Sequence, residues 1–188
     1  SWSEAGTIAD LAQSSNGFEN KKLDDYEPVT DAMLAAPASG DWLNWRRTQN
    51  GHGFSPLDQV NRSNVKQLRL SWAMTMREGS NQGTPLVHNG VMFLTHPQNT
   101  IQAIDAASGE LYWEYAYDYP PESQTLGGPT KNIALYNDKV FFSTYDAAIV
   151  ALDARSGTQV WRSVKADYKA GYTHTAGPVV AAGVLIGG

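Results

Sequence analysis

The sequence predicts an all-β protein that forms part of a β-propeller. Three observations lead to this fold class: a motif that recurs at a fixed offset, a second pair of similar segments further apart, and a composition rich in turn-forming and aromatic residues. The 188 residues include 17 Gly, 6 Trp and 9 Tyr. Frequent Gly turns together with aromatic residues are typical of short β-strands joined by tight connections.

The repeated motif lies in the second half of the chain. Residues 103–113 read AIDAASGELYW, and residues 151–161 read ALDARSGTQVW. Ala, Asp, Ala, Ser, Gly and Trp recur at an offset of 48 positions. A period of about 40–50 residues is typical of propeller blades.

Each copy of the motif predicts a β-hairpin. In the first copy, an apolar strand over residues 101–104 ends at Asp105, whose carboxylate can accept hydrogen bonds from backbone N–H groups of the turn. Gly109 supplies the positive φ that such a turn demands. A second strand then carries Trp113, which we expect to be packed in the core. The second copy repeats this pattern with Asp153, Gly157 and Trp161.

Two further strands precede each hairpin. They are expected over residues 85–87 and 91–94 in the first unit, and over residues 133–135 and 140–143 in the second. Each unit therefore contains about four short strands, which is the strand content of one propeller blade.

A third unit begins near the end of the chain. Residues 178–186 (PVVAAGVLI) are similar to residues 85–93 (PLVHNGVMF), 93 positions earlier. Since propellers have at least four blades, we expect two complete blades and part of a third to leave a sheet edge uncovered. The expectation is that this chain needs further polypeptide for stability, either in one longer chain or in a separate one.

Residues 1–40 show no blade pattern. We divide the chain into an N-terminal extension (1–40), an entry segment with a closing strand (41–80) and the propeller blades (81–188). Within the extension a short helix is possible over residues 7–13, and Thr30 is a candidate N-cap for a helix over 31–36, which Pro37 would end.

The entry segment contains two short apolar runs, at residues 65–68 and 70–73. They lead into the first blade. In a propeller, a strand in this position can complete the last blade and so close the ring.

Composition and charge exclude several functions. The net charge of −5 makes the chain a poor partner for nucleic acid or an anionic membrane surface. The absence of cysteine excludes disulfides and thiolate chemistry, and no apolar run approaches the roughly 20 residues of a membrane helix. The four histidines have no metal-ligand spacing, and the spacing of Asp118, Glu122, Asp146 and Asp167 supports no catalytic role.

These segments resemble a known family. The Ala-x-Asp-x-x-x-Gly-x-x-x-Trp repeat is similar to the tryptophan-docking motif of dehydrogenases that depend on pyrroloquinoline quinone (PQQ), which are eight-bladed propellers. Residues 41–47 (DWLNWRR) resemble the entry segment of the alcohol-oxidising members, and residues 82–87 (QGTPLV) resemble their first blade. The resemblance covers roughly residue 30 to the end, and residues 1–29 have no place in it.

The resemblance implies three cofactor-binding residues, and no catalytic or metal-binding residue, in this chain. Gln82 stands where many members have a Glu that binds PQQ, Lys131 stands where many have an Arg, and Thr175 matches a Thr whose hydroxyl contacts the cofactor. Many members also stack a vicinal disulfide on PQQ. The corresponding stretch here, near residues 125–126, has no cysteine, so the resemblance points to a subgroup without that pair.

The reaction implied by the resemblance is alcohol oxidation by hydride transfer to PQQ, with Ca²⁺ or a lanthanide as Lewis acid. The metal ligands would lie beyond residue 188, so this chain alone is expected to be inactive. The implied partners are the remainder of the propeller, a small alcohol, and an electron acceptor such as a cytochrome c, and the implied location is the periplasm. Neither a nucleic-acid partner nor a membrane span is expected.

Two alternatives remain open at the level of sequence. One is a non-catalytic PQQ-like propeller that acts as a binding or scaffold protein. The other is a related quinoprotein that acts on sugars or polymeric alcohols. Convergence of Gln82, Lys131 and Thr175 around one axial cavity would favour a cofactor site, and their dispersal over the outer rim would exclude one.

Overall fold

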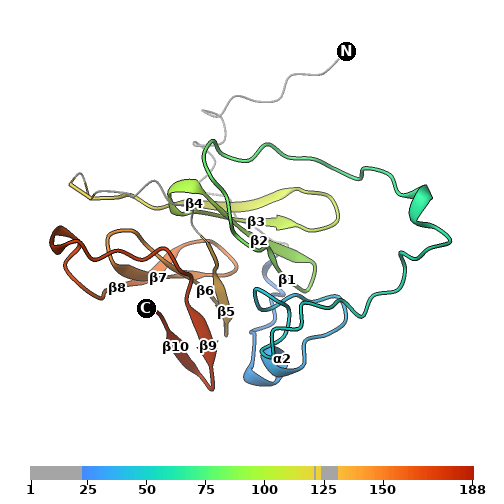
Figure 1. The fold of residues 1–188 in the computed structure, drawn as a ribbon, viewed down its shortest axis with the longest axis horizontal. Helices are drawn as coiled ribbons and strands as arrows, with labels where there is room; N and C mark the ends of the chain where they lie inside the picture. The colour runs from blue at the N-terminus through green and yellow to red at the C-terminus, as the bar shows by residue number, and fades with distance from the viewer. Residues whose placement is uncertain (1–22, 121, 124–130) are drawn as a thin grey trace, which may run out of the picture.

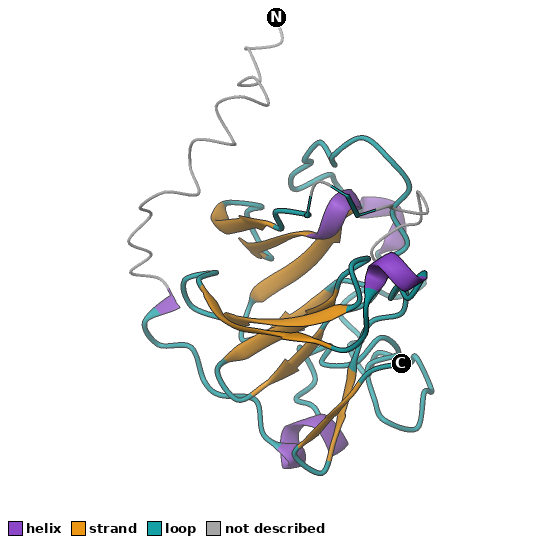
Figure 2. Ribbon diagram, turned by 90° about the vertical axis from the view of Figure 1, so that its left-hand side faces the viewer, coloured by secondary structure: helices purple, strands orange, loops and turns teal. Residues whose placement is uncertain are grey.

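The computed structural model describes residues 23–120, 122–123 and 131–188, and it is built from antiparallel β-sheets (Figure 1), whose strands are drawn in orange in Figure 2. The first sheet, ordered β1-β2-β3-β4, contains β1 (Leu86–His88), β2 (Val91–His96), β3 (Thr100–Asp105) and β4 (Leu111–Ala116). The second, ordered β5-β6-β7-β8, contains β5 (Ala134–Tyr136), β6 (Lys139–Ser143), β7 (Ala148–Asp153) and β8 (Gln159–Val164). A hairpin of β9 (Val179–Ala181) and β10 (Val184–Ile186) follows.

The predicted blades are confirmed as two four-stranded antiparallel sheets and a two-stranded start of a third. Both four-stranded sheets share an irregularity at the same point of the motif. The register between the third and fourth strands shifts after Ala103 in one sheet and after Ala151 in the other. In each sheet this Ala pairs with the motif Trp, so the bulge determines how the fourth strand orients the Trp side chain.

The turn chemistry expected of the motif is also confirmed. Asp105 Oδ1 accepts hydrogen bonds from the backbone N–H groups of Ala107 and Ser108, at 2.9 and 2.8 Å. Asp153 does the same one blade later. Gly109 and Gly157 have φ values of +75° and +71°, the left-handed region that favours glycine.

Tryptophan side chains lock each blade to the next. Trp113 of the first sheet donates from Nε1 to the carbonyl oxygen of Ala154, at 2.9 Å, and its ring lies on Gly157. A Cβ at Gly157 would come within 2.5 Å of the ring, so only glycine fits under it. Trp72, upstream of the first sheet, makes the same pair of contacts with Ala106 and Gly109.

The expectation that Trp161 is buried in the core is wrong for this chain. Its side chain contacts Phe141, with ring centroids 5.8 Å apart, but 36% of it remains exposed. Trp72 and Trp113 are covered by an Asp-x-x-x-Gly turn of the following blade. No such turn follows Trp161 in the part of the chain that the structure describes.

The segment before the blades packs against their inner strands. Thr30 caps the helix α2 (Asp31–Ala35) by accepting from Met33 N, which confirms the predicted cap, although the helix ends one residue earlier than expected. Val29 pairs with Asn137 and Trp42 with Val87, so the segment is joined to both blades. The helix proposed over residues 7–13 lies outside the described residues. None of the described helices is long and apolar enough to cross a membrane.

One predicted strand is absent. Residues Val65–Gln67 form a 3₁₀ helix, η2, and the structure assigns no strand to the run at 70–73 (Figure 1). Leu70 is 84% exposed. A strand is defined by its ladder partner, and in the described part of the chain this segment has none. Its closing of a ring therefore stays a prediction.

The Asp105 turn makes stability depend on pH in a defined range. Hydrogen bonds from the Tyr112 hydroxyl, then from the Ser108 backbone and hydroxyl, lower the pKa of Asp105 to about 2. Because the pKa is depressed in the folded state, this stabilisation is present above pH 3.8 and is lost as the pH falls through about 2. We expect Asp105→Asn to reduce the pH dependence of the free energy of unfolding between pH 4 and 2. Urea titrations at a series of pH values measure this dependence.

The control for this prediction is Asp58→Asn, which changes an exposed carboxylate in the entry segment. An unchanged pH slope in Asp105→Asn would contradict the assignment.

Candidate functional site

The three predicted cofactor residues precede three successive inner strands, Gln82 before β1, Lys131 before β5 and Thr175 before β9. The segments that carry them are in contact. A Cβ at Gly83 would lie 2.8 Å from the Lys131 carbonyl oxygen, and Thr95 Oγ1 donates to that oxygen at 3.2 Å. A Cβ at Gly177 would lie 2.7 Å from the Asn132 Cα and closer still to the Asn132 carbonyl. The backbone therefore brings the three segments side by side.

The side chains of these three residues give no direct support for a cofactor site. Gln82 is exposed, and Lys131 and Thr175 are half-buried. Within the described residues, no hydrogen bond or ion pair holds any of these three side chains. They do not line either of the two cavities described below, so their role in cofactor binding stays a prediction. The stretch near residues 125–126, which the resemblance matches to a vicinal disulfide, lies outside the described residues.

The smaller cavity, of about 40 Å³, lies beneath the inner strands. It is lined by residues next to the predicted positions, including Asn132, Gly177 and Pro178, together with Leu34 and Leu43 of the N-terminal segment. Most of its lining residues are apolar, and its small volume makes it a packing gap where β5, β9 and the N-terminal segment meet.

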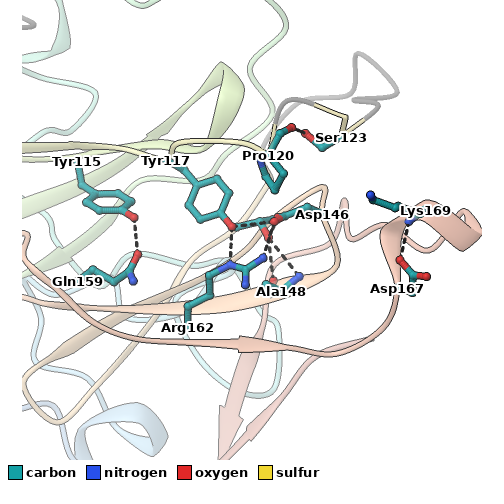
Figure 3. Close-up of polar contacts among 11 residues, drawn as sticks. Tyr115, Tyr117, Pro120, Ser123, Asp146, Ala148, Gln159, Arg162, Asp167 and Lys169 are labelled. Carbon is teal, nitrogen blue, oxygen red and sulfur yellow. Dashed lines mark hydrogen bonds and ion pairs between the residues drawn. The ribbon is translucent and has the colours of Figure 1, made fainter.

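A charged cluster joins the first sheet to the second (Figure 3). Asp146, in the turn between β6 and β7, is fully buried. Its Oδ2 accepts from the Tyr117 hydroxyl at 2.9 Å and from Arg162 Nη2 at 2.6 Å, and Thr144 donates to its Oδ1. Arg162 Nε also donates to the Tyr117 oxygen at 2.7 Å. We call these four residues the Asp146 cluster.

Electrostatics keep Asp146 ionised in this cluster. Burial by itself opposes its charge, but the hydrogen bonds from Thr144, Arg162 and Tyr117 outweigh burial and lower its pKa. Burial, partly opposed by the hydrogen bond from Arg162, raises the pKa of the Tyr117 hydroxyl, so this group stays protonated and donates. The cluster is a satisfied ion pair with no free group for acid–base chemistry.

An analogous cluster joins the segment containing Trp72 to the first sheet. Arg77 Nη2 donates to Glu114 at 2.5 Å, and Gln102 Nε2 donates to the other Glu114 oxygen at 2.6 Å. His96 and Gln102 are joined at 2.7 Å, and burial lowers the pKa of His96. Glu114 and Arg162 both follow a motif Trp directly, so the same position carries opposite charges in the two blades.

His88 has a structural role because it joins two segments that lie far apart in the sequence. His88, buried in β1, places Nδ1 2.9 Å from Asp41 Oδ2 and Nε2 2.8 Å from the Glu27 carbonyl, which fastens the N-terminal segment to the first sheet. Among the described residues, no group of three or more His, Asp or Glu side chains converges as metal ligands would.

A run of aromatic rings leads from the Asp146 cluster to a larger cavity. Tyr117 meets Tyr119 edge-to-face at 4.9 Å, and Tyr119 stacks on Tyr145 at 5.8 Å. Tyr145 in turn lines a cavity of about 300 Å³. Neither the Asp146 cluster nor this cavity was foreseen, because their members have no regular spacing in the sequence.

The sequence matches the family model "Glucose/ethanol/alcohol dehydrogenase, beta-propeller domain", of the PQQ group, over residues 42–162. It is 37% identical over 159 residues to the dehydrogenase subunit of the quinone alcohol dehydrogenase of Gluconobacter oxydans, covering 79% of this chain and 21% of that protein. It is 38% identical over 142 residues to a quinoprotein alcohol dehydrogenase of Pseudomonas putida, covering 73% and 24%.

Solved structures agree with the sequence matches. The quinohemoprotein alcohol dehydrogenase ADHIIG of Pseudomonas putida HK5 aligns with a TM-score of 0.73 and 30% identity, over 84% of this chain and 24% of that one. A europium-containing methanol dehydrogenase aligns with a TM-score of 0.70 and 27% identity, over 81% and 28%. The chain thus spans 21–24% of the length of these curated relatives.

Proposed function

Because this chain belongs to the β-propeller family of PQQ-dependent alcohol dehydrogenases, we propose that it forms one wall of the PQQ pocket in an enzyme that oxidises alcohols. The observation that carries the proposal is the contact between the three segments that precede β1, β5 and β9. These segments hold Gln82, Lys131 and Thr175 on neighbouring stretches of backbone. The remaining blades would come from further polypeptide, in the same chain or another.

The residues present fit this cofactor. PQQ is an anionic tricarboxylate, and Lys131 is a half-buried residue whose ammonium group has no partner among the described residues. Thr175 offers a hydroxyl donor, and Gln82 an amide that can both donate and accept but carries no charge. Gly83 and Gly177 allow the segments to approach because any side chain there would clash with the neighbouring blade.

Under this proposal the chain binds and orients, and it supplies no catalytic base. Lys131 offsets carboxylate charge, and Gln82 and Thr175 fix the orientation of the ring system. PQQ, when bound, supplies a quinone carbonyl that accepts hydride from the alcohol, polarised by Ca²⁺ or a lanthanide. The proton acceptor and metal ligands would lie in the other blades. A periplasmic location and an electron acceptor such as a cytochrome c belong to the same proposal.

The test is the affinity for PQQ of the complete propeller reconstituted with PQQ and Ca²⁺. We expect Lys131→Met to raise the Kd for PQQ about tenfold or more, since it removes a charge-assisted hydrogen bond. Lys131→Arg should retain most of the affinity. Absorbance titration measures the binding of PQQ. The thermal midpoint of each variant reports on folding. Both variants keep the Lys131 backbone carbonyl, on which the contact between the segments depends.

The matched control is Lys66→Met, which removes an exposed lysine of η2. Equal PQQ affinity in Lys131→Met and Lys66→Met would refute the placement of the cofactor. The 188-residue chain alone serves as a second comparison, and it is expected neither to retain PQQ nor to oxidise alcohols.

A further inference from the structure

Two Asn-Gly pairs lie in the described residues, and their surroundings differ. Asn50-Gly51 lies in the entry segment, and Asn89-Gly90 forms the turn between β1 and β2. The pair Asn16-Gly17 lies outside the described residues. Asparagine followed by glycine is prone to lose its side-chain amide spontaneously, because glycine has no Cβ to hinder attack by its own backbone nitrogen. The surroundings of each pair then decide how readily it reacts.

The turn at Asn50 polarises the side-chain carbonyl of this residue. Asn50 Oδ1 accepts from the Thr48 hydroxyl at 2.5 Å and from the backbone N–H of His52 at 3.4 Å. Attack on this carbonyl places negative charge on its oxygen, so two donors that already point at the oxygen stabilise the transition state. Asn50 is exposed, which gives water access to the carbonyl and lets ammonia leave.

The charge beside this turn favours the same reaction. A Cβ at Gly51 would lie 3.9 Å from Arg46 Cδ, and Arg46 makes no ion pair in the part of the chain that the structure describes. A nearby cation favours both the anionic nitrogen that attacks and the oxyanion that follows. The Gly51 N–H donates to the Thr48 carbonyl at 2.9 Å, so this one turn bond must open before the nitrogen can attack.

The second pair is held in a way that opposes the reaction. Asn89 and Gly90 have φ values of +48° and +78°, and they form the two-residue turn of the β1–β2 hairpin, whose ladder fixes the backbone on both sides. The Asn89 N–H donates to Asp41 Oδ1 at 3.1 Å, and Asn89 Nδ2 donates to Glu27 Oε2 at 3.3 Å. Carboxylates beside the turn disfavour a developing negative charge.

We propose that Asn50-Gly51 is a site of spontaneous deamidation in the folded protein and that Asn89-Gly90 is protected from this reaction. The Gly51 nitrogen gives its proton to water and bonds to Asn50 Cγ, the bond from Cγ to Nδ2 breaks, and the amide group takes up a proton and leaves as ammonia. Water then opens the succinimide at either carbonyl, which gives aspartate or isoaspartate, and nothing is oxidised or reduced. The product has one more negative charge, and isoaspartate adds a methylene group to the backbone of the turn.

The experiment follows both pairs in one sample by peptide mapping with mass spectrometry, while the protein is incubated at mildly alkaline pH. In the folded protein we expect Asn50 to react about tenfold or more faster than Asn89, since the hairpin must open before Asn89 can react. In urea, where the local sequence alone sets the rates, the two rates should be similar. Methylation by an isoaspartyl methyltransferase gives a second readout of isoaspartate at Asn50.

Variants of the neighbouring residues separate the effect of the turn from that of the Asn-Gly sequence. Thr48→Val removes the hydroxyl donor and should slow the reaction at Asn50 about threefold to tenfold, whereas Thr48→Ser keeps a hydroxyl and should react as the parent does. Arg46→Met should slow the reaction about twofold. Arg62→Met, which changes another exposed arginine of the entry segment, should leave the rate unchanged.

Two results would each overturn the proposal. One is a ratio of the Asn50 and Asn89 rates in the folded protein that equals the ratio in urea. The other is an equal rate at Asn50 in Thr48→Val and Thr48→Ser. PQQ takes no part in this reaction, so its outcome is independent of the test at Lys131 and of the proposed function.

Discussion

Replacing Trp113 by alanine is expected to lower the free energy of unfolding by about 3–5 kcal/mol. The side chain is 5% exposed and packs on Gly157 of the next blade and on Phe93 of its own, with the rings of Trp113 and Phe93 6.0 Å apart. Alanine would leave a cavity between the blades and would deprive the Ala154 carbonyl of its donor. Chemical unfolding followed by circular dichroism measures the loss.

Trp161→Ala is the matched control because it changes the same motif position one blade later. In the 188-residue chain its side chain is 36% exposed, and no turn covers it in the described residues, so in this chain we expect a loss of only about 1 kcal/mol. Losses of equal size in the two variants would show that contact between the blades contributes little to stability.

Replacing Asp146 by alanine is expected to cost about 3–5 kcal/mol, since it removes one partner of a buried ion pair. The Arg162 guanidinium and the Tyr117 hydroxyl would lose their common acceptor. The depressed pKa of Asp146 means that its carboxylate is the form that the fold stabilises. The loss is measured by urea unfolding at neutral pH.

The control here is Asp138→Ala, which breaks ion pairs with Lys139 and Arg155, whose side chains are 28% and 36% exposed. Exposed pairs contribute about 0–1 kcal/mol, so this variant should unfold almost as the parent does. An Asp146→Ala protein as stable as Asp138→Ala would contradict the stabilising role of the Asp146 cluster. Arg162→Met, made alone and in the Asp146→Ala background, completes a double-mutant cycle that isolates the pair.

The blades could be predicted from the sequence because their signals are local. Asp105 reaches backbone groups two and three residues away, and Gly109 needs only its own positive φ. Such interactions involve only a few consecutive residues, and their recurrence 48 positions later indicates a repeated blade. The Thr30 cap is equally local, which is why the helix at residues 31–35 was predicted to within one residue.

Predictions that depended on a partner elsewhere were less successful. A closing strand was expected within the entry segment. Its apolar runs have no ladder partner in the described part of the chain, and residues Val65–Gln67 form a 3₁₀ helix, so the closing of a ring stays a prediction. The burial of Trp161 likewise depends on a turn of a further blade. Its motif matches that of Trp113, so its own sequence could not distinguish the two environments.

The sequence alone determined the propeller architecture, the family and three candidate cofactor residues, Gln82, Lys131 and Thr175. Only the tertiary structure showed that the segments carrying these residues touch, through Gly83 and Gly177. Only the tertiary structure showed that Tyr117, Asp146 and Arg162 form one cluster, and only the tertiary structure showed the tyrosine-lined cavity. The physical reason is the separation in sequence of the interacting residues. Turns and caps form between near neighbours, whereas buried ion pairs and cavities depend on how separate blades pack.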